Sequence, residues 1–298
     1  MPNVTVLIPV LNAEATLMQT LDSLVAQTYR DFEVMLVNNG SSDATSAIAH
    51  SYRYRILLTI LNLEKNLGVA GALNLGLAQI SSPLIARLDA DDLALPTRLE
   101  KQVAFLDQHP QIDICGSALE VFFDDGSKPS MAVQKPLDDA AIKTTLIQST
   151  AMSHPATLIR KSFFEDVGVF DPRLDFAEDY DLWCRGALLG KRYANLPEVL
   201  TKYRIHANQV SQQKVQLQFQ RDLTVKRKYI SALLGAEQTG YLAEFFSMVA
   251  QFAGMDATMT VITDCFPRLL KLGQRVADPQ LFADIVTSSI NRHLRRLQ

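Results

Sequence analysis

Cysteine is scarce in this chain, which has three among 298 residues: Cys115, Cys184 and Cys265. They are odd in number, lie far apart and include no Cys-x-x-Cys spacing. This pattern argues against a disulfide framework and a structural zinc site, and it favours a reducing compartment. We expect the three thiols to be buried structural side chains.

An excess of positive charge is also lacking. The chain has 29 Lys and Arg residues against 32 Asp and Glu residues, and a formal net charge of −3. A protein that holds nucleic acid through phosphate contacts needs a basic surface, so we expect no nucleic-acid partner. With 48% hydrophobic and 20% charged residues, the composition is that of an ordinary globular protein.

Hydrophobic runs long enough to span a bilayer are missing as well. The most apolar late stretch, Tyr241 to Cys265, is interrupted by Glu244, Gly254 and Asp256, whereas a membrane helix needs about 20 predominantly apolar residues. Met1-Pro2-Asn3 leads directly into an apolar strand, without the basic segment of a signal peptide. We therefore expect a cytoplasmic protein.

The first half of the sequence alternates strand-like and helix-like segments. Apolar, β-branched runs predict strands at 4–10, 32–37, 56–61 and 84–88, and helical spacing of apolar residues predicts helices at 15–26, from about 45, and at 69–80. This rhythm predicts an α/β fold with a Rossmann-like, mostly parallel sheet and helices on both faces. We expect residues 1–210 to form this domain and residues 211–298 to form a helical C-terminal region.

Polar residues follow three of the predicted strands directly, in the stretches Pro9–Glu14, Asn38–Asp43 and Asp89–Asp92. In sheets of this kind, ligands bind beyond the carboxyl ends of the strands. We expect the three stretches to converge on one ligand-binding crevice.

The strongest local motif is Asp89-Ala90-Asp91-Asp92, with three carboxylates in four positions. Like charges packed this closely repel each other, so they favour a bound cation. Asp89 and Asp91 could bind one Mg²⁺ or Mn²⁺ while phosphate oxygens fill other positions. The alternative is a solvated acidic turn before the helix that begins near Thr97.

Two further motifs could carry chemistry. Glu178-Asp179 begins a predicted helix, where acidic residues favour the helix dipole, but Asp179 could also accept a proton from an attacking hydroxyl as a general base. His206 could bind a metal or a phosphate, although a lone histidine is more often structural. Gly68 and Gly71 allow a close backbone turn at a helix start, and no Walker lysine follows them.

Together these stretches resemble the family 2 glycosyltransferases, inverting enzymes of the GT-A fold, over about Val4 to Ser211. The matching elements are the opening strand with the loop Pro9–Glu14, the segment Asn38–Asp43 where the family has Asp-Asp-Gly-Ser, the Asn-x-Gly segment from Asn66 to Gly76, the DxD element Asp89–Asp92, Pro96–Gln102, His154-Pro155-Ala156, the pair Glu178-Asp179, and Tyr203–His206. Each motif is modest alone, and their joint order is specific.

The resemblance implies a role for each matching position. Pro9, Asn12 and Glu14 would border the nucleoside and Asn39 would face the base, with Asp43, Asn66, Gly68 and Asp92 on the nucleotide side. Asp89 would lie near the ribose or the diphosphate and share the metal with Asp91. His206 would approach the diphosphate or the metal. Asp179, in the pair with Glu178, would be the base.

Two positions depart from the family pattern. Asn38-Asn39 replaces an acidic pair, and Leu73 stands where many members have Arg. An amide offers both a donor and an acceptor, so Asn39 could still pair with uracil; it could equally signal another base. We expect a UDP-sugar as the donor and a glycan or lipid-linked glycan as the acceptor.

Two alternatives stay open at this point. One is a sugar-phosphate nucleotidyltransferase, although the loop Pro9–Glu14 has neither the glycine nor the basic residue that this class uses near a triphosphate. The other is a non-catalytic scaffold of a polysaccharide-assembly complex. The C-terminal helices could dock on the first domain, pair with a second copy in a homo-oligomer, or place Arg292, Arg295 and Arg296 against anionic lipid on the inner face of a membrane.

Overall fold

The computed structural model describes residues 2–206, 215–235 and 269–296. Its strands are β1 (Val4–Val10), β2 (Phe32–Asn38), β3 (Leu58–Asn62), β4 (Leu84–Arg87), β5 (Leu93–Ala94), β6 (Ile114–Phe123), β7 (Met131–Val133), β8 (Leu158–Arg160) and β9 (Tyr193–Ile205). Its helices are α1 (Leu17–Val25), α2 (Thr45–Ser51), α3 (Gly68–Leu77), α4 (Arg98–Gln108), α5 (Asp139–Thr145), α6 (Lys161–Val167), α7 (Glu178–Leu188), α9 (Val215–Leu234) and α12 (Pro279–Arg296), with short 3₁₀ turns η1 (His154–Ala156) and η2 (Pro172–Leu174).

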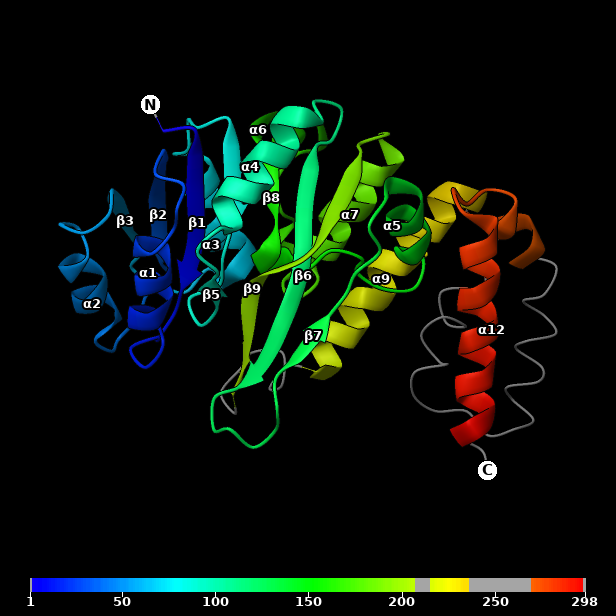
Figure 1. The fold of residues 1–298 in the computed structure, drawn as a ribbon. Coiled ribbons are helices and arrows are strands. Elements are labelled where there is room, and N and C mark those ends of the chain that lie inside the picture. The colour runs from blue at the N-terminus through cyan, green and yellow to red at the C-terminus, as the bar shows by residue number, and fades with distance from the viewer. Residues whose placement is uncertain (1, 207–214, 236–268, 297–298) are drawn as a thin grey trace.

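The strands form one curved sheet in the order β3-β2-β1-β4-β8-β6-β9-β5, with β7 paired to β6 (Figure 1). The first four strands are parallel, as predicted. Their connections are helical crossovers, which a parallel pair requires. From β8 onward the sheet is mixed, because β8 runs antiparallel to both β4 and β6.

Strand β9 is the main element that the periodicity does not predict. It runs parallel to β6 and antiparallel to β5. Pro197 and Glu198 interrupt its apolar pattern, and the pairing with β6 shifts register near Ala118. A bulge of this kind breaks the alternation of inward and outward side chains by which a strand is recognised.

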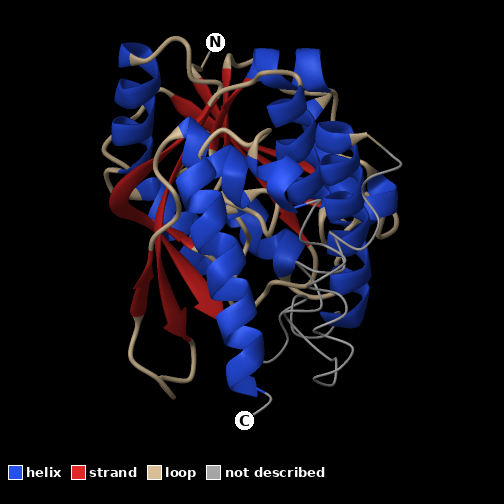
Figure 2. Cartoon of the chain, turned by 90° about the vertical axis from the view of Figure 1, so that its right-hand side faces the viewer, coloured by secondary structure: helices blue, strands red, loops and turns tan. Residues whose placement is uncertain are grey.

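Hydrophobic cores lie on both faces of the sheet, and helices cover both (Figure 2). Leu7 packs into one core with α3 and α7, whereas its neighbours Val6 and Ile8 pack into the other with α1 and α4. Side chains of successive strand residues point to opposite faces, so β1 is buried on both sides. This explains its nearly continuous apolar sequence.

The described part of the C-terminal region packs onto the first domain. Val225, Tyr229 and Ile230 of α9 are buried in the same core cluster as Trp183 of α7, and the two helices lie side by side (Figure 1). The Tyr229 hydroxyl also donates to the Lys143 carbonyl at 3.2 Å. Of the three arrangements considered for these helices, docking on the first domain is observed for α9.

Several predictions fall outside the described residues. They concern the apolar stretch from Tyr241 to Cys265, the thiol of Cys265, and the contact of Arg292, Arg295 and Arg296 with lipid. Cys115 and Cys184 are buried free thiols, as predicted. Among the helices that the structure describes, none combines the length and the apolar character that a membrane span requires.

Candidate active site

The loop after β1 and the loop after β2 are fastened to each other by reciprocal hydrogen bonds. The Asn12 backbone N–H donates to Ser41 Oγ at 3.0 Å, and the side-chain oxygen Asn12 Oδ1 accepts from the Ser42 backbone N–H at 2.9 Å. Glu14 N–H donates to Asp43 Oδ2 at 3.0 Å, and Glu14 Oε2 accepts from the Ala44 N–H at 2.9 Å. Two of the three predicted stretches therefore meet, with Asn12, Glu14 and Asp43 shaping the rim.

The third stretch joins them from the loop after β4. The hydroxyls of Thr16 and Thr20, on the chain that follows the first loop, both donate to the Ala90 carbonyl, at 3.0 and 2.9 Å. Pro9, near the end of β1, is partly exposed and lies opposite Val37 of β2. The predicted convergence of the three strand ends is confirmed.

Asn39 is buried, and its side chain forms hydrogen bonds with other residues of the protein. Its Nδ2 donates to Asn66 Oδ1 and to the Gly68 carbonyl, both at 3.0 Å, and its Oδ1 accepts from the Leu67 N–H at 2.9 Å. Both amide hydrogens are thus used. The Asn39 side chain holds the loop after β2 against the start of α3. Asn66 and Gly68 are its partners in this contact.

Asp89 is paired with a buried arginine that follows from no sequence motif. Arg87 Nη2 lies 2.6 Å from Asp89 Oδ1, and the Arg87 side chain is only 4% exposed whereas that of Asp89 is 33% exposed. Arg87 also donates to the Leu88 carbonyl. A fully buried arginine needs such partners, and here they fix the carboxylate at the mouth of the loop.

Asp91 meets His206 where β5, which begins just after Asp91, pairs antiparallel with β9, which ends just before His206. Asp91 Oδ2 lies 3.0 Å from His206 Nε2, and both side chains are about a quarter exposed. Burial and the neighbouring Asp89 carboxylate raise the pKa of Asp91, and His206 opposes that shift. A cation at this point would relieve the repulsion between the two carboxylates.

A carboxylate and an imidazole are groups that could supply two ligands to Mg²⁺ or Mn²⁺, and Asp91 and His206 are the pair that the structure brings together. In the part of the chain that the structure describes, no three His, Cys, Asp or Glu side chains surround a common metal position. Asp89 is turned toward Arg87, so the pair Asp91–His206 is the better-placed part of the predicted metal site.

Asp92, which the resemblance put on the nucleotide side, has its side chain inside the protein. It is fully buried, and its Oδ1 accepts from the Arg204 N–H at 2.9 Å. Burial, together with Asp89 and Asp91, raises its pKa well above the usual value. Arg204 donates in turn to the Asp91 carbonyl at 2.8 Å. Asp92 thus supports the loop from beneath and ties it to β9.

Asp179 lies in the first turn of α7 and is partly exposed. Its Oδ1 accepts from the Tyr180 N–H at 2.7 Å. Burial raises the pKa of Asp179 to about 6, against the opposing effects of that hydrogen bond and of the Lys135 and Arg87 charges. A carboxyl with a pKa near 6 is ionised at neutral pH and is a stronger base than an ordinary aspartate.

Glu178 is placed differently from its neighbour. It is buried, and burial together with the Asp179 charge raises its pKa to about 8. Its Oε1 lies 3.9 Å from His154 Nδ1, and burial lowers the pKa of His154 well below the usual value. Both groups are therefore neutral at pH 7. Burial favours a supporting role for Glu178 beside Asp179 over the predicted catalytic role.

Lys135, on the loop before α5, is a second cation that the motifs do not reveal. Its Nζ donates to the Thr150 carbonyl at 3.3 Å, and burial lowers its pKa while the Asp179 charge opposes that shift. The positive charge of Lys135 lowers the pKa of Asp179 and so favours its ionised form.

Comparisons with known proteins agree with this geometry. Residues 5–168 match the model of the family described as Glycosyl transferase family 2. The amylovoran biosynthesis glycosyltransferase AmsE of Erwinia amylovora is 35% identical over 213 residues, which cover 70% of this chain and 79% of that protein. The putative glycosyltransferase EpsE of Bacillus subtilis strain 168 is 32% identical over 207 residues, which cover 68% of this chain and 73% of that protein.

Solved structures share the fold at lower sequence identity. S. aureus TarS 1–349 in complex with UDP has a TM-score of 0.64 at 19% identity, covering 100% of this chain and 89% of that one. The mannosyltransferase PcManGT from Pyrobaculum calidifontis, in complex with GDP-Man and Mn²⁺, has a TM-score of 0.61 at 17% identity, covering 100% and 88%. The predicted GT-A-type fold is confirmed, and the chain belongs to glycosyl transferase family 2 as a glycosyltransferase.

Proposed function

We propose that this glycosyltransferase moves a sugar from a nucleoside diphosphate sugar, expected to be a UDP-sugar, to a hydroxyl group of a glycan or lipid-linked glycan, with inversion at the anomeric carbon. The observation that carries the proposal is the position of Asp179. It is a partly exposed carboxyl in the first turn of α7 with a pKa of about 6, which burial and the Asp89 carboxylate of the DxD loop raise. A base and a diphosphate-binding loop are the two parts that such a transfer needs.

Asp179 would accept the proton of the acceptor hydroxyl as that oxygen attacks the anomeric carbon. The bond from that carbon to the diphosphate breaks in the same displacement, so an α-linked donor yields a β-glycoside. Lys135 and Arg87 favour the ionised form of Asp179, so the base is ready at neutral pH. General-base catalysis of this kind contributes roughly 10²–10⁴-fold to a rate.

Asp91 and His206 would hold Mg²⁺ or Mn²⁺ together with the diphosphate. The metal would supply Lewis-acid stabilisation of the negative charge on the leaving diphosphate. Asp89, held by Arg87, would face the ribose or the diphosphate. The complexes of TarS with UDP and of PcManGT with GDP-Man and Mn²⁺ support a nucleotide donor and a divalent metal.

The base of the nucleotide would be recognised by the shape of the pocket and by backbone groups. Asn39 uses both amide hydrogens within the chain, so it would form the wall of the pocket and hold its loops together. Pro9, Asn12 and Glu14 would line the nucleoside side of the same rim. The proposal of UDP is supported by the complex of TarS with UDP and requires no direct Asn39–uracil pair.

A role in polysaccharide biosynthesis is supported by the relative named for amylovoran biosynthesis. We accordingly propose a glycan or lipid-linked acceptor and a cytoplasmic enzyme. The family assignment decides against the nucleotidyltransferase alternative. The non-catalytic scaffold is disfavoured because Asp89, Asp91 and Asp179 are all present.

The test is a panel of UDP-, GDP- and dTDP-sugars incubated with the full chain, Mn²⁺ and a simple glycoside acceptor. Nucleotide release identifies the donor, and NMR of the product gives the anomeric configuration. We expect one nucleotide to be released and an inverted linkage to form. A retained configuration would refute the single displacement, and the release of inorganic pyrophosphate from a nucleoside triphosphate would favour the nucleotidyltransferase.

A further inference from the structure

Hydrogen bonds join α3 to the segment that precedes Asp179, the proposed general base. Asp175 Oδ1 accepts from the Ala70 N–H at 2.9 Å, across 105 residues of sequence. Ala70 lies in the first turn of α3, where unpaired N–H groups and the helix dipole favour a carboxylate. Asp175 thus caps a helix that belongs to a different part of the chain.

Gly68 leaves the room that this contact needs. Its φ is +77°, and a Cβ built on it would lie 2.6 Å from Asp175 Oδ2. Any side chain at position 68 would push Asp175 away. The Gly68 carbonyl also accepts from Asn39 at 3.0 Å, so the residue that admits Asp175 is the one that braces the nucleotide loop.

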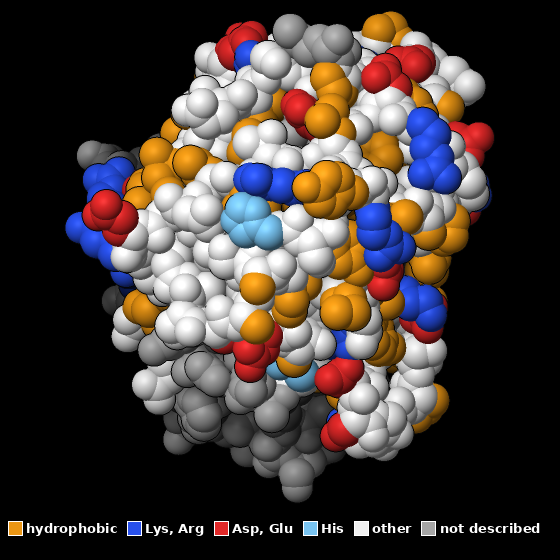
Figure 3. Space-filling model, turned by 90° about the vertical axis from the view of Figure 1, so that its left-hand side faces the viewer, with side chains coloured by type: hydrophobic (Ala, Val, Ile, Leu, Met, Phe, Trp, Pro, Cys, Tyr) orange, Lys and Arg blue, Asp and Glu red, His pale blue; other side chains and the backbone are white. Residues whose placement is uncertain are grey.

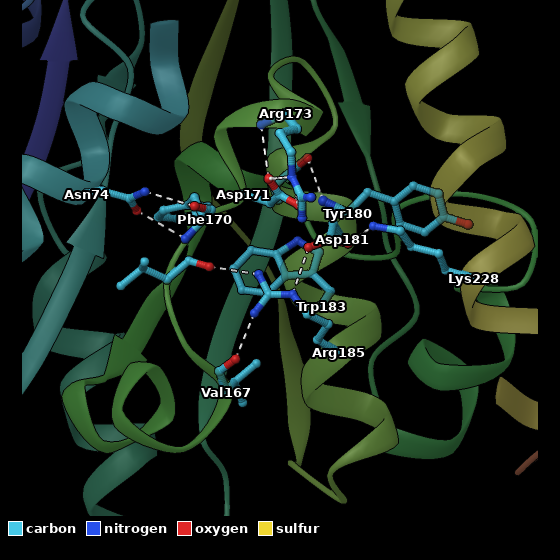
Figure 4. A network of polar contacts seen from close by, with 12 residues as sticks. Asn74, Val167, Phe170, Asp171, Arg173, Tyr180, Asp181, Trp183, Arg185 and Lys228 are labelled. Atoms are coloured by element: carbon cyan, nitrogen blue, oxygen red, sulfur yellow. Dashed lines mark hydrogen bonds and ion pairs between the residues drawn. The ribbon is translucent and has the colours of Figure 1, made fainter. Parts of the chain in front are cut away.

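A second anchor holds the same segment farther back. The Asn74 side chain of α3 binds both backbone groups of Phe170: its Nδ2 donates to the Phe170 carbonyl at 2.8 Å, and its Oδ1 accepts from the Phe170 N–H at 3.0 Å (Figure 4). Residues 170–175 are therefore tied to α3 at both ends, by side chains of Asn74 and Asp175.

The backbone between the front anchor and the base is strained. Phe176 has a φ of +76°, a conformation that costs a bulky L-residue on the order of 1–3 kcal/mol and that persists only where its surroundings enforce it. Glu178 and Asp179 follow immediately and begin α7. The Ala177 N–H donates to the Leu174 carbonyl at 2.9 Å across this turn, and the Asp175 anchor ties the turn to α3.

We propose that Asp175 is a positioning residue of the transferase: by capping α3 it fixes Asp179 relative to the nucleotide loops. The proposal rests on the proposed function, in which Asp179 is the base. Displacing a catalytic group by about 1 Å can cost roughly 10²-fold in rate, whereas the donor site itself, built from the loops after β1, β2 and β4, would stay intact.

The test compares Asp175→Ala with Asp175→Asn in the full chain. The alanine variant loses the acceptor for the Ala70 N–H, and we expect its kcat to fall at least about 10-fold while the affinity for UDP with Mn²⁺ stays within about threefold. The asparagine variant keeps an acceptor oxygen and should recover most of the lost activity. Asp171→Ala is the matched control, because Asp171 lies in the same loop and caps the Arg173 N–H without contacting α3.

An unchanged kcat in Asp175→Ala, an equal loss in Asp175→Asn, or a loss of UDP affinity as large as the loss of kcat would each overturn the proposal. Should Asp175→Ala fail to fold, Asn74→Ala releases the same segment at its other anchor and must show the same split between kcat and affinity.

A third readout separates this inference from the proposed function. Hydrogen exchange over residues 177–181 should accelerate in Asp175→Ala and not in Asp171→Ala, whether or not a donor has been found. If the wild type turns over no sugar nucleotide, the proposed function fails. The hydrogen-exchange comparison then still shows whether Asp175 fixes residues 177–181. If the wild type is active and Asp179→Asn is inactive, a fully active Asp175→Ala refutes only the anchor.

Discussion

His206 Nε2 lies 3.0 Å from Asp91 Oδ2, although 115 residues separate them in the sequence. The contact joins the residue after β9 to the loop between β4 and β5, and β5 pairs antiparallel with β9. One turn of the DxD loop and one strand end thereby present a carboxylate and an imidazole to the same point, each about a quarter exposed.

Removing either member of this pair should weaken metal-dependent nucleotide binding. A hydrogen bond to a charged group is worth about 1.5–3 kcal/mol, so we expect Asp91→Ala and His206→Ala to lower UDP affinity in Mn²⁺ by about 10- to 150-fold, measured by titration calorimetry. His50→Ala is the control, because His50 is exposed on α2. Equal affinity with and without Mn²⁺ in the wild type would contradict the assignment.

Replacing the proposed base should stop transfer and spare donor binding. We expect Asp179→Asn to lower kcat by about 10²–10⁴-fold with little change in UDP affinity. Glu178→Gln is the matched comparison on the same turn. Because the pKa of Glu178 is about 8, the glutamine mimics the protonated side chain at pH 7, and kcat should stay within about threefold. The assignment fails if the two variants lose activity equally.

The rate should depend on pH through Asp179. A base must be unprotonated to act, and its pKa is about 6, so kcat should fall tenfold per pH unit below about pH 6. Lys135→Met removes a positive charge that lowers this pKa, and the acid limb should move to higher pH. Lys101→Met, at an exposed lysine paired with Glu198, should leave the profile in place. A profile that Lys135→Met does not shift would count against the effect of the Lys135 charge on the pKa of Asp179.

Local patterns predict the first half of this fold well. β1 and β2 are nearly continuous apolar runs, the buried residues of α1 follow helical spacing, and parallel strands place their ends together. The segment Asp89–Asp92 could therefore be assigned to the crevice from the sequence. One sequence feature indicates a buried ion pair: Arg87 is a charged residue within an apolar strand, and a buried arginine needs a partner such as Asp89.

The contacts that distinguish neighbouring acidic residues could not be predicted in this way. Asp91 and Asp92 are adjacent, yet one meets His206 and the other is buried against the Arg204 N–H. Arg204 lies in β9 and His206 follows it directly, and the bulge and internal proline of β9 hide its strand pattern. Glu178 and Asp179 likewise differ only through tertiary burial, which no local pattern encodes.

The distribution of charged and hydrophobic side chains on the face shown in Figure 3 does not indicate a binding partner. On the face that presents α2 and β3, acidic, basic and hydrophobic side chains are interspersed, and in its described part neither sign of charge forms a continuous patch (Figure 3). Tyr54 and Leu57 are the large hydrophobic residues most exposed near this edge, at 99% and 60%. Isolated exposed apolar residues are normal on globular proteins.

The C-terminal helix α9 should contribute to the stability of the whole chain. Ile230 is fully buried in the core that contains Trp183, and truncating a buried isoleucine to alanine costs about 2–5 kcal/mol. We expect Ile230→Ala to lower the unfolding free energy by that amount in a single denaturant transition. Thr224→Ala, at an exposed site on α9, should change it by less than about 0.5 kcal/mol. Two separate transitions would instead indicate an independent C-terminal unit.

The central claim is a metal-dependent site for a nucleoside diphosphate at the ends of β1, β2 and β4. Its most direct test is thermal unfolding of the full chain with UDP, GDP, dTDP and CMP, each with and without Mn²⁺. A ligand at a hundred times its dissociation constant stabilises the folded state by about 2.7 kcal/mol. We predict a clear rise in Tm with one diphosphate, UDP before the others, and only when Mn²⁺ is present. A Tm that no nucleotide changes in either condition would contradict the site.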